Sequence, residues 1–396
     1  MQEHPRHFFG IIGITTFTKL LMNIARRMVY PFAPEFARGL SVDLSAITSV
    51  IAMNQATAIL GPVGASFADR YGYKLLMLWA LGFLTIGTFA AGFIPLYSVL
   101  VVCLFLAGLS KSIFDPSLQA FLGSFVPFEH RGKIIGITEL AWAGSTLGGI
   151  PMAGLLIQRF SWQTPFWIMG LLSLICFGLI LKFMPKDPLK KKNSRTAPSP
   201  FGSNWKTIVR NRQVLGILLF SFFMSLASDN LFVIYGAWLE QSYGLSLTAI
   251  GLSTILIGIA ELLGEGFTVL FSDRIGLKRS ILIGTGLCTL AYFLLPALDT
   301  GLFFVLTGLF LVFLSFEFTI VTAMSLTTEL VPDLRASTMS AFYAIGGLGR
   351  VAGAFAGGML WSSSGLAGIS LVSGGCTLMA LVCALVGFSR SKKRAQ

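Results

Sequence analysis

The chain is predicted to be an all-α membrane protein with twelve transmembrane helices in two repeated six-helix halves. Three observations predict this fold class. Hydrophobic residues make up 55% of the chain, charged residues only 12%, and the mean hydropathy is +0.79, whereas a soluble domain carries about 25% charge. Twelve apolar blocks follow one another, each near the roughly 20 residues that a helix needs to cross hydrocarbon. A short polar hairpin motif also occurs twice, about 205 residues apart.

The twelve blocks are expected to be helices. Gly and Pro recur within them, and the alternating ten-residue pattern of a membrane β-barrel does not appear. Residues 1–10 show no basic region, short apolar core and small-residue cleavage site, so no removable signal peptide is expected. The expected spans are 8–37, 45–67, 74–95, 97–126, 134–158, 164–184, 213–241, 246–271, 279–298, 300–328, 337–362 and 366–388.

One long polar stretch divides the blocks into six and six. It runs over 185–212 and is rich in Pro, Ser, Asn and basic residues. The predicted domains are therefore an N-terminal bundle over 1–184, a cytoplasmic linker over 185–212, and a C-terminal bundle over 213–396 that ends in a basic cytoplasmic tail.

Several short patterns recur at nearly one offset. The sequence D-R-x-G-x-K stands at 69–74 and again at 273–278, and Val-Pro stands at 126–127 and 331–332. Gly-x-x-x-Gly occurs at 144–148 and at 349–353. Matches at a shared offset indicate a duplicated unit. Small residues at every fourth position also let helix backbones approach closely, so we expect tight helix crossings at both glycine pairs.

The basic surplus is interpreted as a topology signal rather than a nucleic-acid one. With both termini placed in the cytoplasm, 21 of the 29 Lys and Arg residues fall in inside segments, against only Arg38 and Arg159 outside. This bias follows the positive-inside rule and places the chain in a membrane with both termini cytoplasmic, most simply a bacterial cytoplasmic membrane. The five cysteines all lie in apolar blocks without metal-ligand spacing and are expected to be packing residues.

These motifs together resemble the major facilitator superfamily over nearly the whole chain. The hairpin at 69–74 resembles that family's loop signature between helices 2 and 3, and 273–278 resembles its relic between helices 8 and 9. Residues 127–132 resemble its loop after helix 4, and the glycine-rich helix 5 partly resembles the signature of its drug/proton antiporters. The resemblance implies two bundles related by a pseudo-twofold axis along the membrane normal, with a central cavity that opens alternately to each side.

The resemblance also implies a cytoplasmic gate at the two hairpins. An alternative is that the hairpins only keep these loops out of the membrane. The implied gating residues are Asp69, Arg70, Gly72, Lys74, Arg131, Asp273, Arg274, Gly276 and Lys278.

Eleven ionisable residues fall at membrane depth. An unpaired charge there costs about 2.5–3.5 kcal/mol or more, so we expect these side chains around water or around each other. None lies well inside blocks 3, 6, 9 or 12, which the family's fold directs toward lipid. The eleven are Lys19, Arg26, Arg27, Lys111, Asp115, Glu139, Asp229, Glu261, Glu265, Glu317 and Arg350.

Helix 1 carries the candidate substrate-binding charges. Lys19, Asn23 and Arg26 share one helical stripe, and arginine offers a planar fork of donors that suits a carboxylate or phosphate. Arg26, with Arg27, is therefore expected to contact an anionic substrate group; an internal ion pair with an acid such as Asp229 or Glu261 is the alternative. The candidate pocket also includes Tyr30, Asn54, Gln55, Trp142, Asn230 and Tyr235.

Acids of the second half are the candidate proton carriers. Glu261 and Glu265 stand four residues apart on one helix face, where two carboxylates repel and one favours holding a proton. Alternatively, one of them pairs with Arg350. Lys111 and Asp115, also four apart, can satisfy each other on helix 4. The candidate proton-coupling residues are Asp229, Glu261, Glu265, Asp115 and Glu317, with Lys111 and Arg350 as charge partners.

The sequence contains no motif typical of an enzyme, so an enzymatic function is not expected. There is no phosphate-cradling Gly-x-x-x-x-Gly-Lys loop and no Gly-x-Ser-x-Gly elbow. His4, His7 and His130 lack ligand spacing, so no metal or cofactor is expected. The predicted function is proton-coupled efflux of a small organic, amphipathic or anionic solute by a monomer in contact with membrane lipid, with no nucleic-acid partner. A lipid or lysolipid transporter of the same fold and a non-transporting membrane sensor are the alternatives.

Overall fold

The computed structural model describes residues 5–60, 71–125, 134, 137–138, 140–185, 210–331 and 335–389. Within these ranges the chain is almost entirely helical and contains no strand. The predicted fold class, an all-α membrane protein, is confirmed. The chain forms two compact units, Met1–Pro200 with Ile234–Gly258, and Phe201–Val233 with Ile259–Gln396. The predicted domain boundaries at 184 and 213 concern the sequence repeat and stay a prediction.

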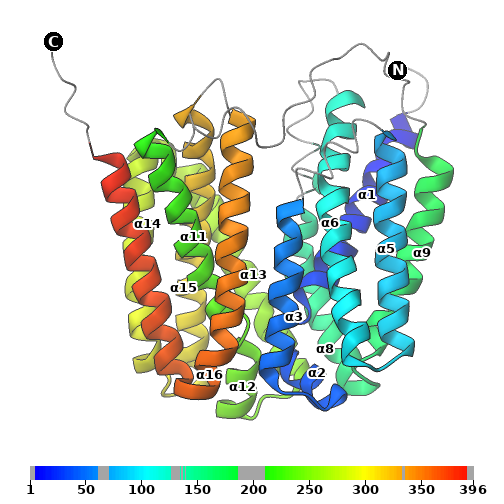
Figure 1. Cartoon of the computed structure of the whole chain (residues 1–396), viewed down its shortest axis with the longest axis horizontal. Coiled ribbons are helices and arrows are strands. Elements are labelled where there is room, and N and C mark those ends of the chain that lie inside the picture. Colours follow the sequence, from blue (N-terminus) through cyan, green and yellow to red (C-terminus); the bar gives the residue numbers. More distant parts are fainter. Residues whose placement is uncertain are drawn as a thin grey trace. The chain divides into compact units, whose positions relative to one another are not determined.

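The first unit is a bundle in which α5 packs against α6 and α9, and α1 packs against α6 and α9 (Figure 1). A short helix of the second sequence half, α12, packs here against α2. Its described elements are α1 (Pro5–Arg27), α2 (Ala33–Leu40), α3 (Leu44–Ala56), η1 (Thr57–Leu60), α5 (Tyr73–Phe93), α6 (Tyr97–Phe125), the π-helical turn η2 (Ser145–Gly149), α8 (Ile150–Arg159), α9 (Thr164–Phe183) and α12 (Tyr235–Tyr243).

In the second unit α11 lies along α16, and α14 packs against both α15 and α16. Helix α13 starts in the first unit and continues into the second. The elements are α11 (Arg212–Phe232), α13 (Leu247–Ile275), α14 (Leu277–Leu294), η3 (Leu295–Leu298), α15 (Leu302–Leu330) and α16 (Arg335–Phe388). α16 contains the last two expected spans. They meet at a kink at Gly365, whose φ of 57° is left-handed.

Nine of the described helices are long and apolar enough to cross a membrane on their own, and a pair bent by 117°, α2 with α3 and η1, forms a tenth candidate. α1 is not among these nine helices of the described part of the chain. With α16 counted twice, these elements account for the twelve expected spans. The first span is broken rather than bent: α1 ends at Arg27, and Pro34 lies in the first turn of α2, where proline is tolerated.

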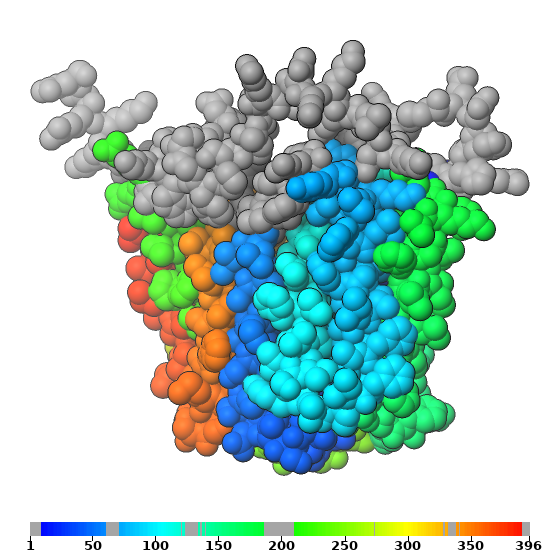
Figure 2. Space-filling view, turned by 45° about the vertical axis from the view of Figure 1, so that its right-hand side comes forward, coloured from blue at the N-terminus to red at the C-terminus, as the bar shows by residue number. Residues whose placement is uncertain are grey.

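Large apolar side chains are exposed on the helices that correspond to spans 3, 6, 9 and 12. Examples are Ile86 at 64% exposure on α5, Leu171 at 54% on α9, Leu287 at 55% on α14 and Leu371 at 66% on α16. Figure 2 shows the continuous surface of α5 and α6 in the first unit. Such surfaces suit hydrocarbon rather than water, as expected of the lipid-facing helices.

The two glycine pairs behave differently. A Cβ at Gly349 or Gly353 of α16 would overlap the carbonyl oxygen of Phe222 or Leu226 in α11, so this tight crossing is confirmed. The expectation for Gly148 is wrong, because nothing lies within 4 Å of a Cβ built there. Its neighbour Gly149 meets α1 instead, at Ile24. The π-helical turn η2 adds a residue to the turn and rotates Gly148 off the crossing.

Candidate functional site

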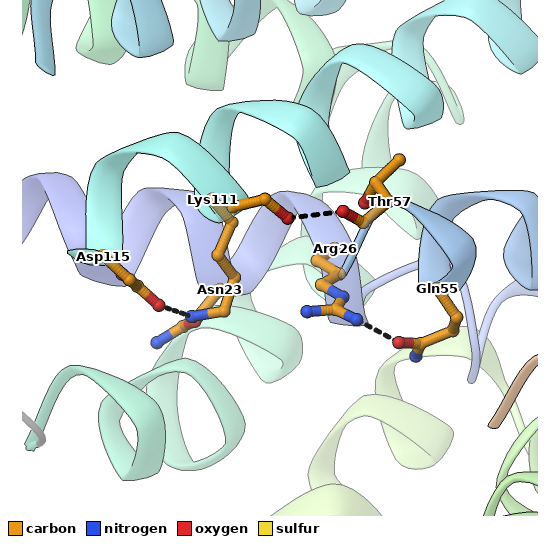
Figure 3. A network of polar contacts seen from close by, with 7 residues as sticks. Asn23, Arg26, Gln55, Thr57, Lys111 and Asp115 are labelled. Atoms are coloured by element: carbon orange, nitrogen blue, oxygen red, sulfur yellow. Dashed lines mark hydrogen bonds and ion pairs between the residues drawn. The ribbon is translucent and has the colours of Figure 1, made fainter. Parts of the chain in front are cut away.

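The first unit holds a polar network at the middle of its apolar helices. The Lys111 ammonium of α6 donates to Asn23 Oδ1 of α1 and to Asp115 Oδ2, both at 2.7 Å (Figure 3). Asn23 is fully buried. Because Lys111 and Asp115 stand one helical turn apart, α6 supplies both ions, and α1 supplies a second, neutral acceptor for the ammonium. The predicted pairing of Lys111 with Asp115 is present.

A second chain of polar side chains links α1 to α3. The Arg26 guanidinium donates to Gln55 Oε1, and the Gln55 amide nitrogen donates to the Tyr30 hydroxyl. Gln55 and Tyr30 are buried, whereas Arg26 is half-buried. Gln55 therefore fixes the position of the guanidinium, which Figure 3 shows beside the Lys111 network. Positioning of this kind lets a charged donor meet a ligand with little loss of side-chain entropy.

Trp142 joins the two groups of cations. The Arg27 guanidinium lies 4.2 Å from the centre of its indole ring, and the Lys111 ammonium lies 5.8 Å from it. Both distances are within the range of cation–π attraction. Arg27 and Lys19 are buried, at 4% exposure each. Two helices, α1 and α6, thus bring Lys19, Arg26, Arg27 and Lys111 into one region. The stripe on helix 1 had predicted this grouping only for the residues of α1.

Asn54 takes part in helix packing. Its amide nitrogen donates to the Leu104 carbonyl of α6, where Gly108 lets η1 approach so closely that a Cβ would meet the Thr57 hydroxyl. Ser112 Oγ donates to the Thr57 carbonyl at 2.9 Å (Figure 3). Thr57 and Ser112 are absent from the sequence-based set of site residues. The small residues around Gly108 were the signal that could have identified this contact.

The second unit contains the predicted acids. Asp229 of α11 is buried and faces Arg350 of α16, with Oδ2 and Nε 4.0 Å apart. Its neighbour Asn230 donates to the Ile369 carbonyl at 3.3 Å and to Ser373 Oγ at 2.8 Å. Asn230 therefore pins α11 to the last part of α16. Tyr235, which was predicted to line the same pocket, is fully buried and belongs to the first unit.

Three glutamates lie where α13 meets α15. A Cβ at Gly264 would come 2.8 Å from Glu317 Cβ, so the α15 backbone packs closely between the positions of Glu261 and Glu265. Glu261 is buried at 7% exposure, and Glu265 and Glu317 are half-buried. The described structure pairs Arg350 with Asp229, whereas the sequence had suggested a pairing with one of these glutamates. Their role in proton coupling stays a prediction.

The glycines of the two repeated hairpins share a backbone conformation. Gly72 has φ 98° and ψ 148°, and Gly276 has φ 91° and ψ 131°, a region that favours glycine. Lys74 Nζ donates to the Leu181 and Met184 carbonyls at the end of α9, at 2.8 and 2.6 Å. Lys278 Nζ lies 5.6 Å from the ring of Phe388 at the end of α16.

Lys74 thus connects α5 to the end of α9, and Lys278 connects α14 to the end of α16. Arg274 is exposed at the end of α13. Asp69, Arg70 and Arg131 lie outside the described residues, as does the side chain of Asp273. The gating roles of these residues therefore stay predictions. Among the described residues, no group of three or more His, Cys, Asp or Glu could hold a metal ion.

A family model described as the Major Facilitator Superfamily matches residues 15–235 and 217–396. The chain belongs to this superfamily. The two matches cover both sequence halves, as the repeated motifs predicted, and membership makes the chain a multi-pass membrane transporter of a family whose members bind small-molecule substrates.

Relatives within the superfamily include efflux pumps. The chain is 28% identical over 331 residues to "Uncharacterized MFS-type transporter YceJ" of Bacillus subtilis, which covers 82% of each chain. It is 26% identical over 268 residues to "Multi-drug resistance efflux pump PmrA homolog" of Lactococcus lactis, covering 65% of each. The solved structure of a bacterial homolog to the human lysosomal transporter Spinster has a TM-score of 0.76 at 14% identity, covering 98% of this chain and 97% of that one, and shows the same fold.

Proposed function

We propose that this superfamily member exports a small organic, anionic or amphipathic compound across the bacterial cytoplasmic membrane by alternating access, in exchange for protons. The observation that carries the proposal is the network of Asn23, Lys111 and Asp115 beside Arg26 in the first unit. Four cationic side chains, from two helices, gather around it at membrane depth. The name of the Lactococcus lactis relative, a multidrug efflux pump, supports export.

In this proposal the substrate's negative or acceptor groups bind to Arg26 and Lys111. The Arg26 side chain is half-buried and its guanidinium donates to Gln55, so it can bind a ligand while it keeps this hydrogen bond. The Lys111 ammonium already has two oxygen partners, and a substrate carboxylate would replace Asn23 as the second. Trp142 offers an aromatic ring next to Lys111 and Arg27, which suits a compound with a planar apolar part.

Proton coupling is assigned to the acids of the second unit. Glu261 is buried, and Glu265 and Glu317 lie nearby across the α13–α15 contact. Acidic side chains at membrane depth are the usual proton carriers of pumps and transporters, so one of these three glutamates is assigned to carry the proton. Asp229, held by Arg350, is the second candidate.

The orientation in this proposal places both termini in the cytoplasm, as the distribution of Lys and Arg indicates. The turn after α1, together with α2 and α12, then lies on the outer side.

Transport in inside-out membrane vesicles tests the proposal. With an inward-acid proton gradient, we expect carboxylated fluorescent dyes to accumulate, and a protonophore to abolish accumulation. Vesicles with the Lys111→Met variant should not accumulate them. Accumulation that equals that of empty vesicles for anionic, neutral and cationic dyes alike would contradict transport of organic compounds and support a sensor.

A further inference from the structure

Arg38, near the end of α2, joins two carboxylates in the first unit. Its Nε and Nη2 donate to Glu35 Oε2 of the same helix at 3.0 and 2.6 Å, and its Nη1 lies 2.7 Å from Glu240 Oε1 of α12. The guanidinium side chain is 53% exposed, and the two carboxylate side chains are 25% and 24% exposed. One cation therefore holds together an acid from each sequence half.

The two acids occupy equivalent positions of the sequence repeat. Glu35 and Glu240 are 205 residues apart, the offset of the other repeated motifs. Pro31 and Gly236 are also 205 apart, and they touch, because a Cβ at Gly236 would overlap the Pro31 carbonyl. Equivalent residues meet each other only close to a pseudo-twofold axis. Arg38 thus lies where the two repeats meet at this end of the unit.

The contact continues along η2 and α8. The backbone nitrogen of Thr248 donates to Gln158 Oε1 at 2.8 Å, and Thr254 Oγ1 donates to the Thr146 carbonyl within the π-helical turn at 3.2 Å. Between them, a Cβ at Gly251 would come 3.2 Å from Pro151 Cα. Residues 234–258 therefore pack closely on helices of the first half, from Arg38 of α2 to Thr146 of η2.

We propose that Arg38 is the latch of the outer gate, which means that its ion pair with Glu240 holds the gate closed. The inference rests on the proposed alternating access and orientation. Opening to the outside must separate residues 234–258, which belong to the second half, from the first-half helices. We call this contact the seam, and the Arg38–Glu240 pair is the ionic contact at its exposed edge. Glu35 stays with Arg38 on α2, so the cation keeps a partner when Glu240 leaves. Exposed ion pairs are weak, so the latch shifts the ratio of closed to open gate only about two- to fivefold.

Cysteine labelling from the outside measures the gate directly. Ala237 of α12 is buried at 1% exposure, and Ala237→Cys in a background without the five native cysteines places a small thiol inside the seam. In right-side-out vesicles, Glu240→Gln should raise the labelling rate with a membrane-impermeant maleimide about two- to fivefold. The matched control Glu35→Gln removes only the bonds within α2 and should raise it much less. The exchange Arg38→Glu with Glu240→Arg should return labelling toward the parent rate.

Equal labelling in the parent and in Glu240→Gln, with unchanged thermal unfolding, would overturn the latch. An equal increase for Glu35→Gln would also overturn it, because the effect would then come from α2 stability. Labelling needs neither substrate nor protons, so these outcomes are independent of whether the proposed substrate class or coupling ion is correct.

Discussion

In the first half of the chain the charges at membrane depth are mostly cations: Lys19, Arg26, Arg27 and Lys111. The positions 205 residues later carry Met224, Leu231, Phe232 and Phe316. The second half instead carries acids, Asp229, Glu261, Glu265 and Glu317, where the first half has Ile24, Ala56, Leu60 and Ser112. Apart from Asp115 in the first half and Arg350 in the second, most of these charges are therefore of opposite sign in the two halves.

This difference indicates a division of roles within a duplicated unit. Both halves keep the residues that the fold needs, such as the hairpin glycines Gly72 and Gly276 with matching backbone angles. The fold does not need a charge at these positions, because each has an uncharged counterpart in the other half. A cationic half suits an anionic substrate, and an acidic half suits a proton.

The largest effect is expected from Lys111→Met, which leaves Asp115 without its ammonium partner at membrane depth. Breaking such a pair costs about 3–5 kcal/mol when buried, so we expect a clearly lower unfolding temperature and at least about a tenfold loss of transport. The double variant Lys111→Met with Asp115→Leu resembles the equivalent positions of the second half, Phe316 and Ile320. It should recover stability without recovering transport. Normal transport by the double variant would show that the pair is only structural.

The next effect concerns Arg26, whose equivalent in the second half is Leu231. Arg26→Leu should weaken uptake of an anionic dye about tenfold or more, because a charge-assisted hydrogen bond is lost, and should affect the neutral ester of the same dye much less. Initial rates at several dye concentrations measure both. Arg159→Gln, at an exposed position in the same unit, is the control. Equal losses for dye and ester would indicate that Arg26 only supports the structure.

The two glycine pairs offer a comparison of stability. Gly349→Ala should destabilise by about 1–3 kcal/mol, because its Cβ would overlap the Phe222 carbonyl and force α11 and α16 apart. Gly148→Ala should be neutral or stabilising by up to about 1 kcal/mol, since its surroundings are open and alanine favours helix. Thermal unfolding in detergent measures both. The same loss at both positions would mean that the π-helical turn does not move Gly148 off the crossing.

The smallest effect separates the two hairpin lysines. Lys74→Met removes two hydrogen bonds to the last carbonyls of α9, and we expect a loss of about 1–2 kcal/mol. Lys278→Met removes a contact with the Phe388 ring, worth about 0.5–1 kcal/mol. Unfolding temperatures of the two variants should fall in that order. The reverse order would contradict the assignment of these contacts.

Much of the fold could be predicted from the sequence because apolar spans and repeats are periodic signals. The site was less predictable. Asn54 and Asn230 were expected to face a substrate, yet their amides bond carbonyls of neighbouring helices, and residue type does not reveal which partner an amide meets. The expected helix crossing at Gly148 was wrong because one π-helical turn changes the helix face on which the following residues lie. The Arg38–Glu240 pair spans 202 positions of sequence, and none of the sequence patterns predicted it.

Proton movement during transport is the most direct test of the proposed division between a cationic and an acidic half. The purified protein would be placed in liposomes that contain a pH-sensitive dye, and the carboxylated compound added without a pre-set gradient. We expect a change of internal pH with the parent protein and with the exposed control Glu329→Gln, and none when Glu261→Gln and Glu265→Gln are combined. Unaltered proton movement in that double variant, with intact substrate flux, would contradict the assignment of the proton to the acidic half.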